Sequence, residues 1–286
     1  MPPKSATTVR QRRIARKLRA WRIDRGRTLD QVGSQLRWSE SKLSRIERAE
    51  SGVGPAEIIA LATILGVDDA ERDRLVQIAR VSSTGHDLWG PYGPESLRGE
   101  FKDFVEDEAE AVQVRTVEST LITGLLQTAE YAEALVRAWD PGAAEEVLAQ
   151  RRQLRQQRQA RLDAPEPLKL HTILYEPTMT VPIGGNAVMR RQLEHLVERS
   201  EAPNITIQLL PLSVGAFPGI GASYHLIDFT EGCAGAAYVE ALQDGTYYED
   251  EDELSAYTLA FDHVRKLALD PAESVRRISE IGESLA

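Results

Sequence analysis

Apolar residues near the start of the chain recur at helical spacing. Ile14, Leu18 and Trp21 are separated by four and three positions, which predicts one buried face of a helix within residues 9–27. Gly26 is the expected end of this helix. The opposite face carries cations: Arg12, Arg13, Arg16, Lys17, Arg19 and Arg22. We interpret this nearly acid-free face as a surface that approaches phosphates, with an ordinary solvated face as the alternative.

The next segment predicts a helix of about two turns. Thr28 and Gln31 have the spacing of a capping box, which satisfies free backbone amides at a helix start. Apolar side chains then line one side of it: Leu29, Val32 and Leu36. Gly33 is small at a position where two helices must cross closely.

A second short helix is predicted after a tight turn at residues 37–38. Ser39 is its expected N-cap, and Leu43 and Ile46 form its buried side. The positions left outside are Glu40, Ser41, Lys42, Ser44, Arg45 and Arg48. A helix-turn-helix has this layout, and its second helix enters the DNA major groove.

The exposed side chains of this helix suit DNA chemistry. The guanidinium of Arg45 matches guanine O6 and N7, and Glu40 can accept from cytosine N4. Ser41 and Lys42 can bond to bases or to phosphates. We therefore predict that residues 28–48 read double-stranded DNA, and the alternative for each side chain is plain solvent exposure.

Glycine and proline recur within residues 82–99, which predicts a linker. The apolar Trp89 and Tyr92 predict that this linker is partly ordered. The expected organisation is therefore a helix-turn-helix domain over residues 1–81 and a second domain over residues 100–286.

The second domain alternates between helical and strand patterns. Helices are predicted over 101–111, 125–139, 143–162, 188–200, 249–269 and 271–285. Strands are predicted over 112–119, 168–175, 204–210, 223–229 and 236–242, the last two as a hairpin-like pair. This mixture predicts an α+β domain in which helices cover a mixed sheet, beside an all-α domain at the amino terminus.

The two predicted domains also differ in net charge. The 286 residues carry a net charge of −10. Residues 1–80 hold 17 Lys and Arg against 10 Asp and Glu, whereas the remainder holds 17 against 34. Such asymmetry favours a nucleic-acid-binding segment, with the acidic part facing away from DNA. No run of about 20 apolar residues and no signal segment is present, so we expect a cytoplasmic protein without membrane contact.

The sequence shows no catalytic constellation. Its five histidines are scattered, and the single Cys233 permits neither an internal disulfide nor a thiolate zinc site. The acidic run at residues 249–253 lacks the spacing of a calcium loop and instead favours a helix start. The glycines of residues 215–221 are interpreted as a loop, and His171 and His225 as satisfied structural histidines. We predict no enzyme activity, no metal and no cofactor.

A small-molecule effector site is the weaker expectation for the second domain. Five polar residues lie beside apolar segments and can orient a ligand in an apolar cleft: Gln127, Tyr131, Glu176, Tyr224 and Glu240. Buried hydrogen bonding explains the same residues equally well, and both interpretations stay open.

Residues 28–48, TLDQVGSQLRWSESKLSRIER, resemble the helix-turn-helix of XRE-type, phage-repressor-like regulators. The resemblance implies a five-helix domain with further helices over 55–65 and 71–81. It also implies base contacts at the matching positions Glu40, Ser41 and Arg45. The chain departs from the family at three positions: Leu29 replaces a phosphate-binding glutamine, and Arg37 and Ala49 replace glycines.

Three further segments, TGLLQTAEYA at 123–132, NITIQLLP at 204–211 and YVE at 238–240, resemble a domain attached to XRE-type regulators of actinobacteria. The excess of arginine over lysine, 28 to 6, agrees with a GC-rich genome. The resemblance implies a regulatory, antitoxin-like domain, and a small companion protein as a further partner. Residues 176–182 depart from the helical motif of that family.

Two functional hypotheses follow. In the first, the chain is a homodimeric transcriptional regulator that reads a near-palindromic operator, because one short helix reads only a few base pairs. In the second, it is a protein-interaction module that sequesters a small companion protein and binds DNA for autoregulation.

Overall fold

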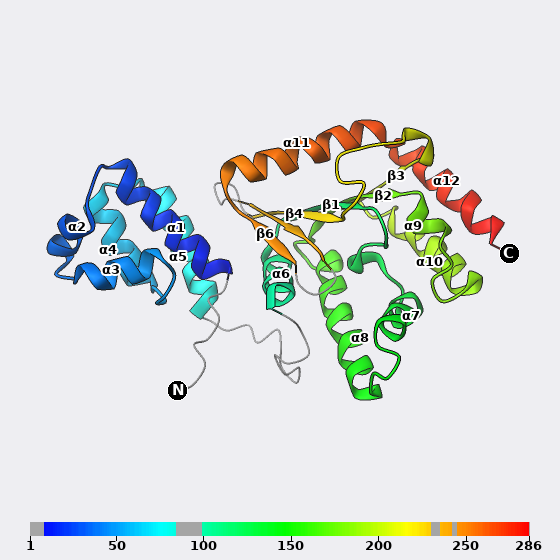
Figure 1. The fold of residues 1–286 in the computed structure, drawn as a ribbon, viewed down its shortest axis with the longest axis horizontal. Helices are drawn as coiled ribbons and strands as arrows, with labels where there is room; N and C mark the ends of the chain where they lie inside the picture. The colour runs from blue at the N-terminus through cyan, green and yellow to red at the C-terminus, as the bar shows by residue number, and fades with distance from the viewer. Residues whose placement is uncertain (1–8, 84–98, 230–234, 242–244, 286) are drawn as a thin grey trace. The chain divides into compact units, whose positions relative to one another are not determined.

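The computed structural model describes residues 9–83, 99–229, 235–241 and 245–285. Most of the predicted linker, with Trp89 and Tyr92, lies outside the described residues, as does Cys233. The chain divides into two compact units, which are described separately (Figure 1). The first contains the elements up to α5, and the second contains all later elements.

Five helices form the amino-terminal unit among the described residues, as predicted. They are α1 (Val9–Asp24), α2 (Leu29–Leu36), α3 (Glu40–Glu47), α4 (Pro55–Leu65) and α5 (Asp69–Ser83). The bounds of α4 are those expected, and α5 begins two residues before the expected range of 71–81.

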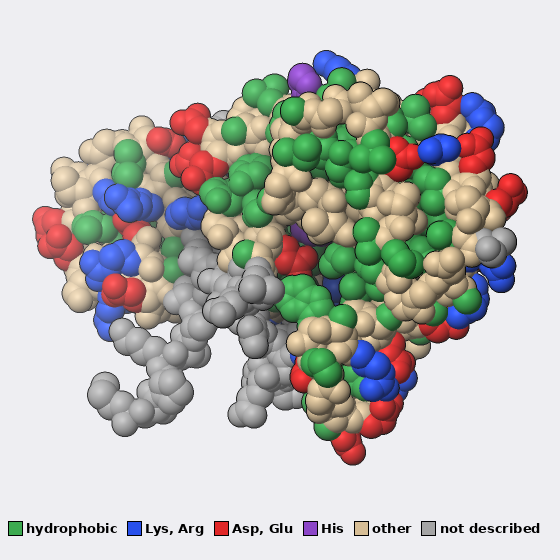
Figure 2. All heavy atoms as spheres, turned by 45° about the vertical axis from the view of Figure 1, so that its right-hand side comes forward, with side chains coloured by type: hydrophobic (Ala, Val, Ile, Leu, Met, Phe, Trp, Pro, Cys, Tyr) green, Lys and Arg blue, Asp and Glu red, His purple; other side chains and the backbone are tan. Residues whose placement is uncertain are grey.

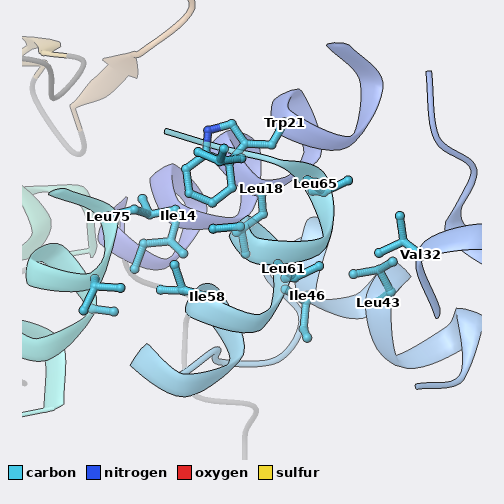
Figure 3. Close-up of a cluster of buried hydrophobic side chains, with 14 residues drawn as sticks. Ile14, Leu18, Trp21, Val32, Leu43, Ile46, Ile58, Leu61, Leu65 and Leu75 are labelled. Atoms are coloured by element: carbon cyan, nitrogen blue, oxygen red, sulfur yellow. The ribbon is translucent and has the colours of Figure 1, made fainter. Parts of the chain in front are cut away.

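All five helices contribute to the core of this unit. Figure 3 shows side chains from α1, α2, α3, α4 and α5 converging, with the Trp21 indole among them. Trp21, Leu43 and Ile46 are each only 1% exposed. Full burial of such a side chain contributes about 1.5–3 kcal/mol, so the apolar face of α3 fixes the outward orientation of its polar face.

Local caps set the bounds of the two short helices. The Thr28 hydroxyl accepts from the Gln31 amide at 3.1 Å, and the Gln31 side chain accepts from the Thr28 amide at 3.0 Å. The Ser39 hydroxyl accepts from the Lys42 amide at 3.1 Å. The predicted capping box and the predicted N-cap are therefore both confirmed.

Gly33 allows the turn to pack against α2. The Trp38 amide donates to the Gly33 carbonyl at 2.8 Å, and a Cβ built on Gly33 would lie 2.8 Å from the Trp38 carbonyl oxygen. Gly33→Ala is expected to destabilise the amino-terminal unit by about 1–3 kcal/mol through this overpacking. Urea unfolding measures the effect, with the exposed Ser34→Ala on the same helix as the control. Equal stability of the two variants would contradict the argument.

The second unit is built on a six-stranded mixed sheet in the order β3-β2-β1-β4-β5-β6. Its strands are β1 (Gln113–Glu118), β2 (Lys169–Tyr175), β3 (Ile205–Leu210), β4 (Tyr224–Asp228), β5 (Ala236–Val239) and β6 (Thr246–Tyr248). β1, β2 and β3 are parallel, whereas β4, β5 and β6 pair antiparallel. The mixed sheet and the β4–β5 pair confirm the prediction, but β6 was not predicted.

Helices cover both faces of this sheet (Figure 1). They are α6 (Gly99–Glu110), α7 (Ala129–Trp139), α8 (Glu145–Ala160), α9 (Pro177–Thr180), α10 (Asn186–Arg199), α11 (Glu251–Leu267) and α12 (Pro271–Ser284). The predicted helix over 125–139 was too long, because residues 124–126 form a separate 3₁₀ turn before α7.

The two faces of the sheet differ in chemistry. On the α11 side, Phe261 and Val264 belong to an apolar cluster with Val117 of β1. On the other side, the Phe104 ring of α6 stacks 4.6 Å from Tyr238 and lies 4.9 Å from His225. The α11 face also carries ionisable groups, because the His171 ring lies 5.1 Å and the Arg115 guanidinium 5.5 Å from the Phe261 ring. The second face differs in that its buried ionisable groups lie among the rings of α6, β4 and β5.

Candidate nucleic-acid interface

Helix α3 exposes three of the predicted DNA-contacting side chains. Glu40, Ser41 and Arg45 are all exposed. Ser41 and Arg45 are one turn apart on the same side of the helix, and the Arg45 Nε donates to the Ser41 carbonyl at 3.3 Å. No described residue forms an ion pair with Arg45, so its guanidinium is free to meet a base edge. The base contacts themselves stay a prediction.

Two of the other predicted contacts, Lys42 and Arg48, have ion-pair partners within the unit. The Lys42 ammonium lies 2.6 Å from a Glu57 carboxylate oxygen and 4.2 Å from the Trp38 ring centroid. Partial burial alone would raise the pKa of Glu57, but hydrogen bonds from Lys42 and the Gly54 amide outweigh it and lower that pKa. Ser44 is partly buried. The remaining cation, that of Arg48, lies 2.9 Å from Glu50 at the surface.

The basic face of α1 is only in part available to phosphates. The side chains of Arg12 and Arg13 lie outside the described residues, and Arg16 is exposed but already has an interaction within the protein. Lys17 instead lies 2.7 Å from Glu71, and this contact lowers the pKa of that carboxyl. Figure 2 shows Lys and Arg side chains on the visible face of this unit, interspersed with Asp and Glu.

An ion pair that the sequence analysis missed connects α1 to α3. The Arg22 Nε and a terminal nitrogen of its guanidinium donate to the two Glu47 oxygens at 2.6 and 2.7 Å, and the side chains are 13% and 6% exposed. The hydrogen bond to Glu47 raises the pKa of Arg22. The expectation that Arg22 faces phosphate was therefore wrong, because this side chain holds the last turn of α3 against α1. Glu47 shares a helix side with Leu43 and Ile46, and this placement was the available signal.

Two turns use residues in the left-handed region where glycine is usual. Arg37 has a φ of 57° and Ala49 a φ of 56°. The Arg37 side chain is exposed beside the start of α3, and no described residue pairs with it. Arg37 is thus a second candidate cation at the interface, which the sequence analysis had treated only as a turn residue.

Comparisons with known proteins agree with this division. Residues 13–75 match a family described as a helix-turn-helix domain. Residues 101–280 match the family described as a domain of unknown function, DUF5753, and this match covers more than half of the chain.

The chain belongs to the DUF5753 family. Its helix-turn-helix domain makes it a DNA-binding regulator in general terms. No curated protein and no solved structure matches it. No helix among the described residues is long and apolar enough to cross a membrane.

Within the DUF5753 domain, two of the five predicted ligand residues form hydrogen bonds to the backbone of one loop. The Gln127 side chain donates to the Ile122 carbonyl at 2.6 Å, and the Tyr131 hydroxyl accepts from the Ile122 amide at 3.3 Å. Both side chains are buried. Their contacts hold the segment between β1 and α7.

The other three predicted ligand residues lie at different places in the domain. Glu176 accepts from the Leu212 amide at 2.8 Å and from Arg277 at 2.7 Å. Tyr224 lies on the α11 side of the sheet, and Glu240 is exposed just after β5. The structure therefore does not bring the five residues into one cluster, and a ligand role for them stays a prediction.

A buried ion pair lies between α6 and α8 instead. The Arg158 guanidinium donates to both Glu108 oxygens at 2.6 and 2.9 Å, with side chains 10% and 3% exposed. Its centre lies 5.6 Å from the Phe101 and Phe104 ring centroids. Burial opposes the charge, but the attraction to Glu108 and its hydrogen bond raise the pKa of Arg158.

Glu118 and His225 face each other on the same side of the sheet. A Glu118 oxygen lies 3.9 Å from the His225 Nε2, and both side chains are buried. Burial raises the pKa of Glu118 to about 8, with Glu240 adding to the effect. Burial also lowers the pKa of His225 to about 3, with Arg158 adding to the effect. Near pH 7 both groups are therefore mainly uncharged.

The two histidines interpreted as satisfied differ in outcome. His171 is partnered through its Nε2, which lies 2.7 Å from the Gln208 side-chain oxygen. For His225 the prediction was wrong, because its buried Nδ1 has no hydrogen-bond partner among the described residues. In the part of the chain that is described, no three His, Cys, Asp or Glu residues are grouped to hold a metal ion.

Proposed function

We propose that the chain is a transcriptional regulator of the XRE type that reads a near-palindromic operator as a homodimer. The observation that carries this proposal is the exposed face of α3, where Ser41 and the unpaired Arg45 lie together. The caps at Ser39 and the Arg22–Glu47 ion pair hold this helix rigidly at both ends. A preorganised helix of this kind inserts its polar face into the major groove without a further ordering cost.

Each exposed group then has a distinct role. Arg45 donates a two-pronged contact to guanine, and Glu40 accepts from cytosine. Arg37 is an exposed cation for the phosphate backbone, and this contact is independent of sequence. A good bidentate base contact contributes about 1–3 kcal/mol of discrimination, so Arg45 is the main determinant of specificity.

The homodimer follows from the length of the reading helix. α3 has eight residues, and such a helix reaches only a few base pairs. Two copies related by a twofold axis read half-sites about 34–36 Å apart, which multiplies the specificity of one helix.

The proposal predicts how Arg45 affects DNA affinity. Arg45→Ala is expected to weaken binding to a fragment of the chain's own promoter by about 5- to 150-fold, the equivalent of 1–3 kcal/mol. Fluorescence anisotropy over a salt series measures this loss, with scrambled DNA as the reference. Arg74→Ala on α5 is the matched control, because it removes one exposed positive charge from the same unit. Equal weak binding to both DNAs, or equal losses in the two variants, would contradict base reading by Arg45.

A second candidate function is an antitoxin-like module that binds a small companion protein. Large exposed apolar side chains in the DUF5753 domain favour it, among them Trp139 at 60% and Val181 at 50% exposure. Co-expression with the product of the neighbouring gene tests this function. A stoichiometric complex that survives gel filtration supports it, whereas separate elution of the two proteins counts against it.

A further inference from the structure

Helix α11 has one side that packs on the sheet. Phe261 and Val264 are 1% and 0% exposed, and they join the apolar cluster formed by β1, β2 and β4. Tyr257 also contributes, with its ring 5.4 Å from the Tyr224 ring centroid. These contacts fix the rotation of α11 and so determine which residues form its outer side.

The outer side of α11 has an apolar residue at its centre and opposite charges at its ends. Leu259 is 67% exposed, the highest value among the large apolar side chains described as exposed. Asp252 and Lys266 lie seven residues before and after it, and a spacing of seven keeps all three on one face. Neither charged side chain has an ion-pair partner among the described residues. Figure 2 shows apolar side chains along the upper rim of the larger unit, where α11 runs in Figure 1.

The outer side of α11 is complementary to a second, antiparallel copy of the same side. Leu259 is the midpoint of α11, with eight residues of the helix on each side. At about 1.5 Å per residue, Asp252 and Lys266 each lie about 10 Å from Leu259 along the axis. In an antiparallel pair of α11 helices, each Asp252 therefore faces a Lys266 while the two Leu259 side chains meet.

We infer that two copies of the chain associate through an antiparallel pairing of α11, with Leu259 on the twofold axis. Asp252 of one copy then forms an ion pair with the partner's Lys266, and the same contact repeats across the axis. Parallel pairing would instead place like charges together. A partner with one sign of charge would be repelled at one end of the helix, so a second copy of this chain is the occupant that fits both ends.

This inference rests on the proposed function, because it supplies the interface of the proposed homodimer. Each copy contributes the same patch, as a closed twofold interface requires. One helix pair buries less surface than the roughly 1,600 Å² of a standard stable interface, so the dimer is expected to dissociate on dilution.

The first test is the mass of the full chain in the absence of DNA. Sedimentation velocity between about 1 and 100 µM is expected to show a monomer–dimer equilibrium. Leu259→Glu is expected to shift it to monomer over this whole range, because it places two carboxylates on the axis. Leu212→Glu is the matched control, because Leu212 is also exposed, at 54%, in the same unit. A wild-type chain that stays monomeric, or a dimer that survives Leu259→Glu, would overturn the inference.

Charge reversal gives an independent second test that does not depend on Leu259. Asp252→Lys alone and Lys266→Asp alone are each expected to weaken the dimer by about 2- to 10-fold, because each places like charges opposite one another. The double variant restores the opposite pairing, and its dissociation constant should return toward that of the wild type. A double variant as weak as the sum of the single losses would overturn the antiparallel register.

The outcomes separate this interface from the DNA-reading proposal. If Leu259→Glu leaves the dimer intact while promoter binding still depends on Arg45, α11 is not the interface and the base-reading helix stands. If α11 mediates the dimer but Arg45→Ala has no effect, the interface stands and the reading proposal fails. The two measurements use different residues in different units, so neither failure conceals the other.

Discussion

Glu118→Gln is expected to change stability little near pH 4.5 and to stabilise the DUF5753 domain by about 3–5 kcal/mol at pH 9. The cause is the buried carboxyl of Glu118, whose pKa rises from an ordinary value of 4.5 to about 8 in the folded protein. The residue is buried, at 4% exposure. Glutamine keeps the shape of the neutral carboxyl but has no proton to lose.

The direction of the effect follows from proton binding. Between pH 4.5 and 8 the folded state keeps the Glu118 proton, whereas the unfolded state has released it. The unfolded state therefore binds fewer protons, and the free energy of unfolding falls as the pH rises through this window. Above pH 8 both states are ionised and the loss is complete.

His225 contributes the opposite slope at lower pH. Its pKa falls from 6.5 to about 3 on folding, so the unfolded state binds more protons between these values. The free energy of unfolding therefore rises with pH from about 3 to 6.5. Between pH 4.5 and 6.5 the two effects oppose each other, so the contributions of Glu118 and His225 largely cancel there.

Urea unfolding at a series of pH values measures both slopes. Circular dichroism follows the unfolding, and the transition of the DUF5753 domain is the relevant one. The wild-type chain should lose stability above pH 6.5, and Glu118→Gln should remove this loss. Parallel profiles for the two proteins would show that Glu118 ionises normally in the fold.

Local patterns allowed the amino-terminal unit to be predicted almost residue by residue. The capping box of Thr28 and Gln31 and the cap at Ser39 depend on neighbours in the sequence, so they were readable in advance. The four-residue spacing of Ile14 and Leu18 likewise identified the buried side of α1. Most of the exposed face of α3 followed as well, because the buried positions of a helix determine the exposed ones, but Lys42 and Ser44 are partly buried.

Contacts between residues far apart in the sequence could not be predicted from local patterns. The Arg22–Glu47 pair spans 25 residues and the Arg158–Glu108 pair spans 50. β6 has only three residues, and it is a strand because it pairs with β5 rather than because of its own pattern. The five predicted ligand residues share a polar side chain and apolar neighbours in the sequence, and these features do not separate a ligand contact from an internal hydrogen bond such as that of Gln127.

Arg158→Met is expected to destabilise the DUF5753 domain by about 3–5 kcal/mol, because it leaves the Glu108 carboxylate buried without its partner. Both side chains are at most 10% exposed, so water cannot replace the lost contact. The same urea transition measures this loss. Arg152→Ala is the control, because its contact with Glu145 at 2.7 Å lies at the surface and should contribute less than about 1 kcal/mol.

A double substitution separates the strength of the pair from the cost of an unpaired charge. Arg158→Met with Glu108→Leu removes both charges and should recover most of the stability lost by Arg158→Met alone. Failure of this recovery would mean that the ion pair itself stabilises the fold strongly. Recovery would mean that the fold tolerates an apolar contact between α6 and α8. In that case the pair acts mainly to fix the position of α6 relative to α8 and the sheet. α6 is the first described helix after the linker.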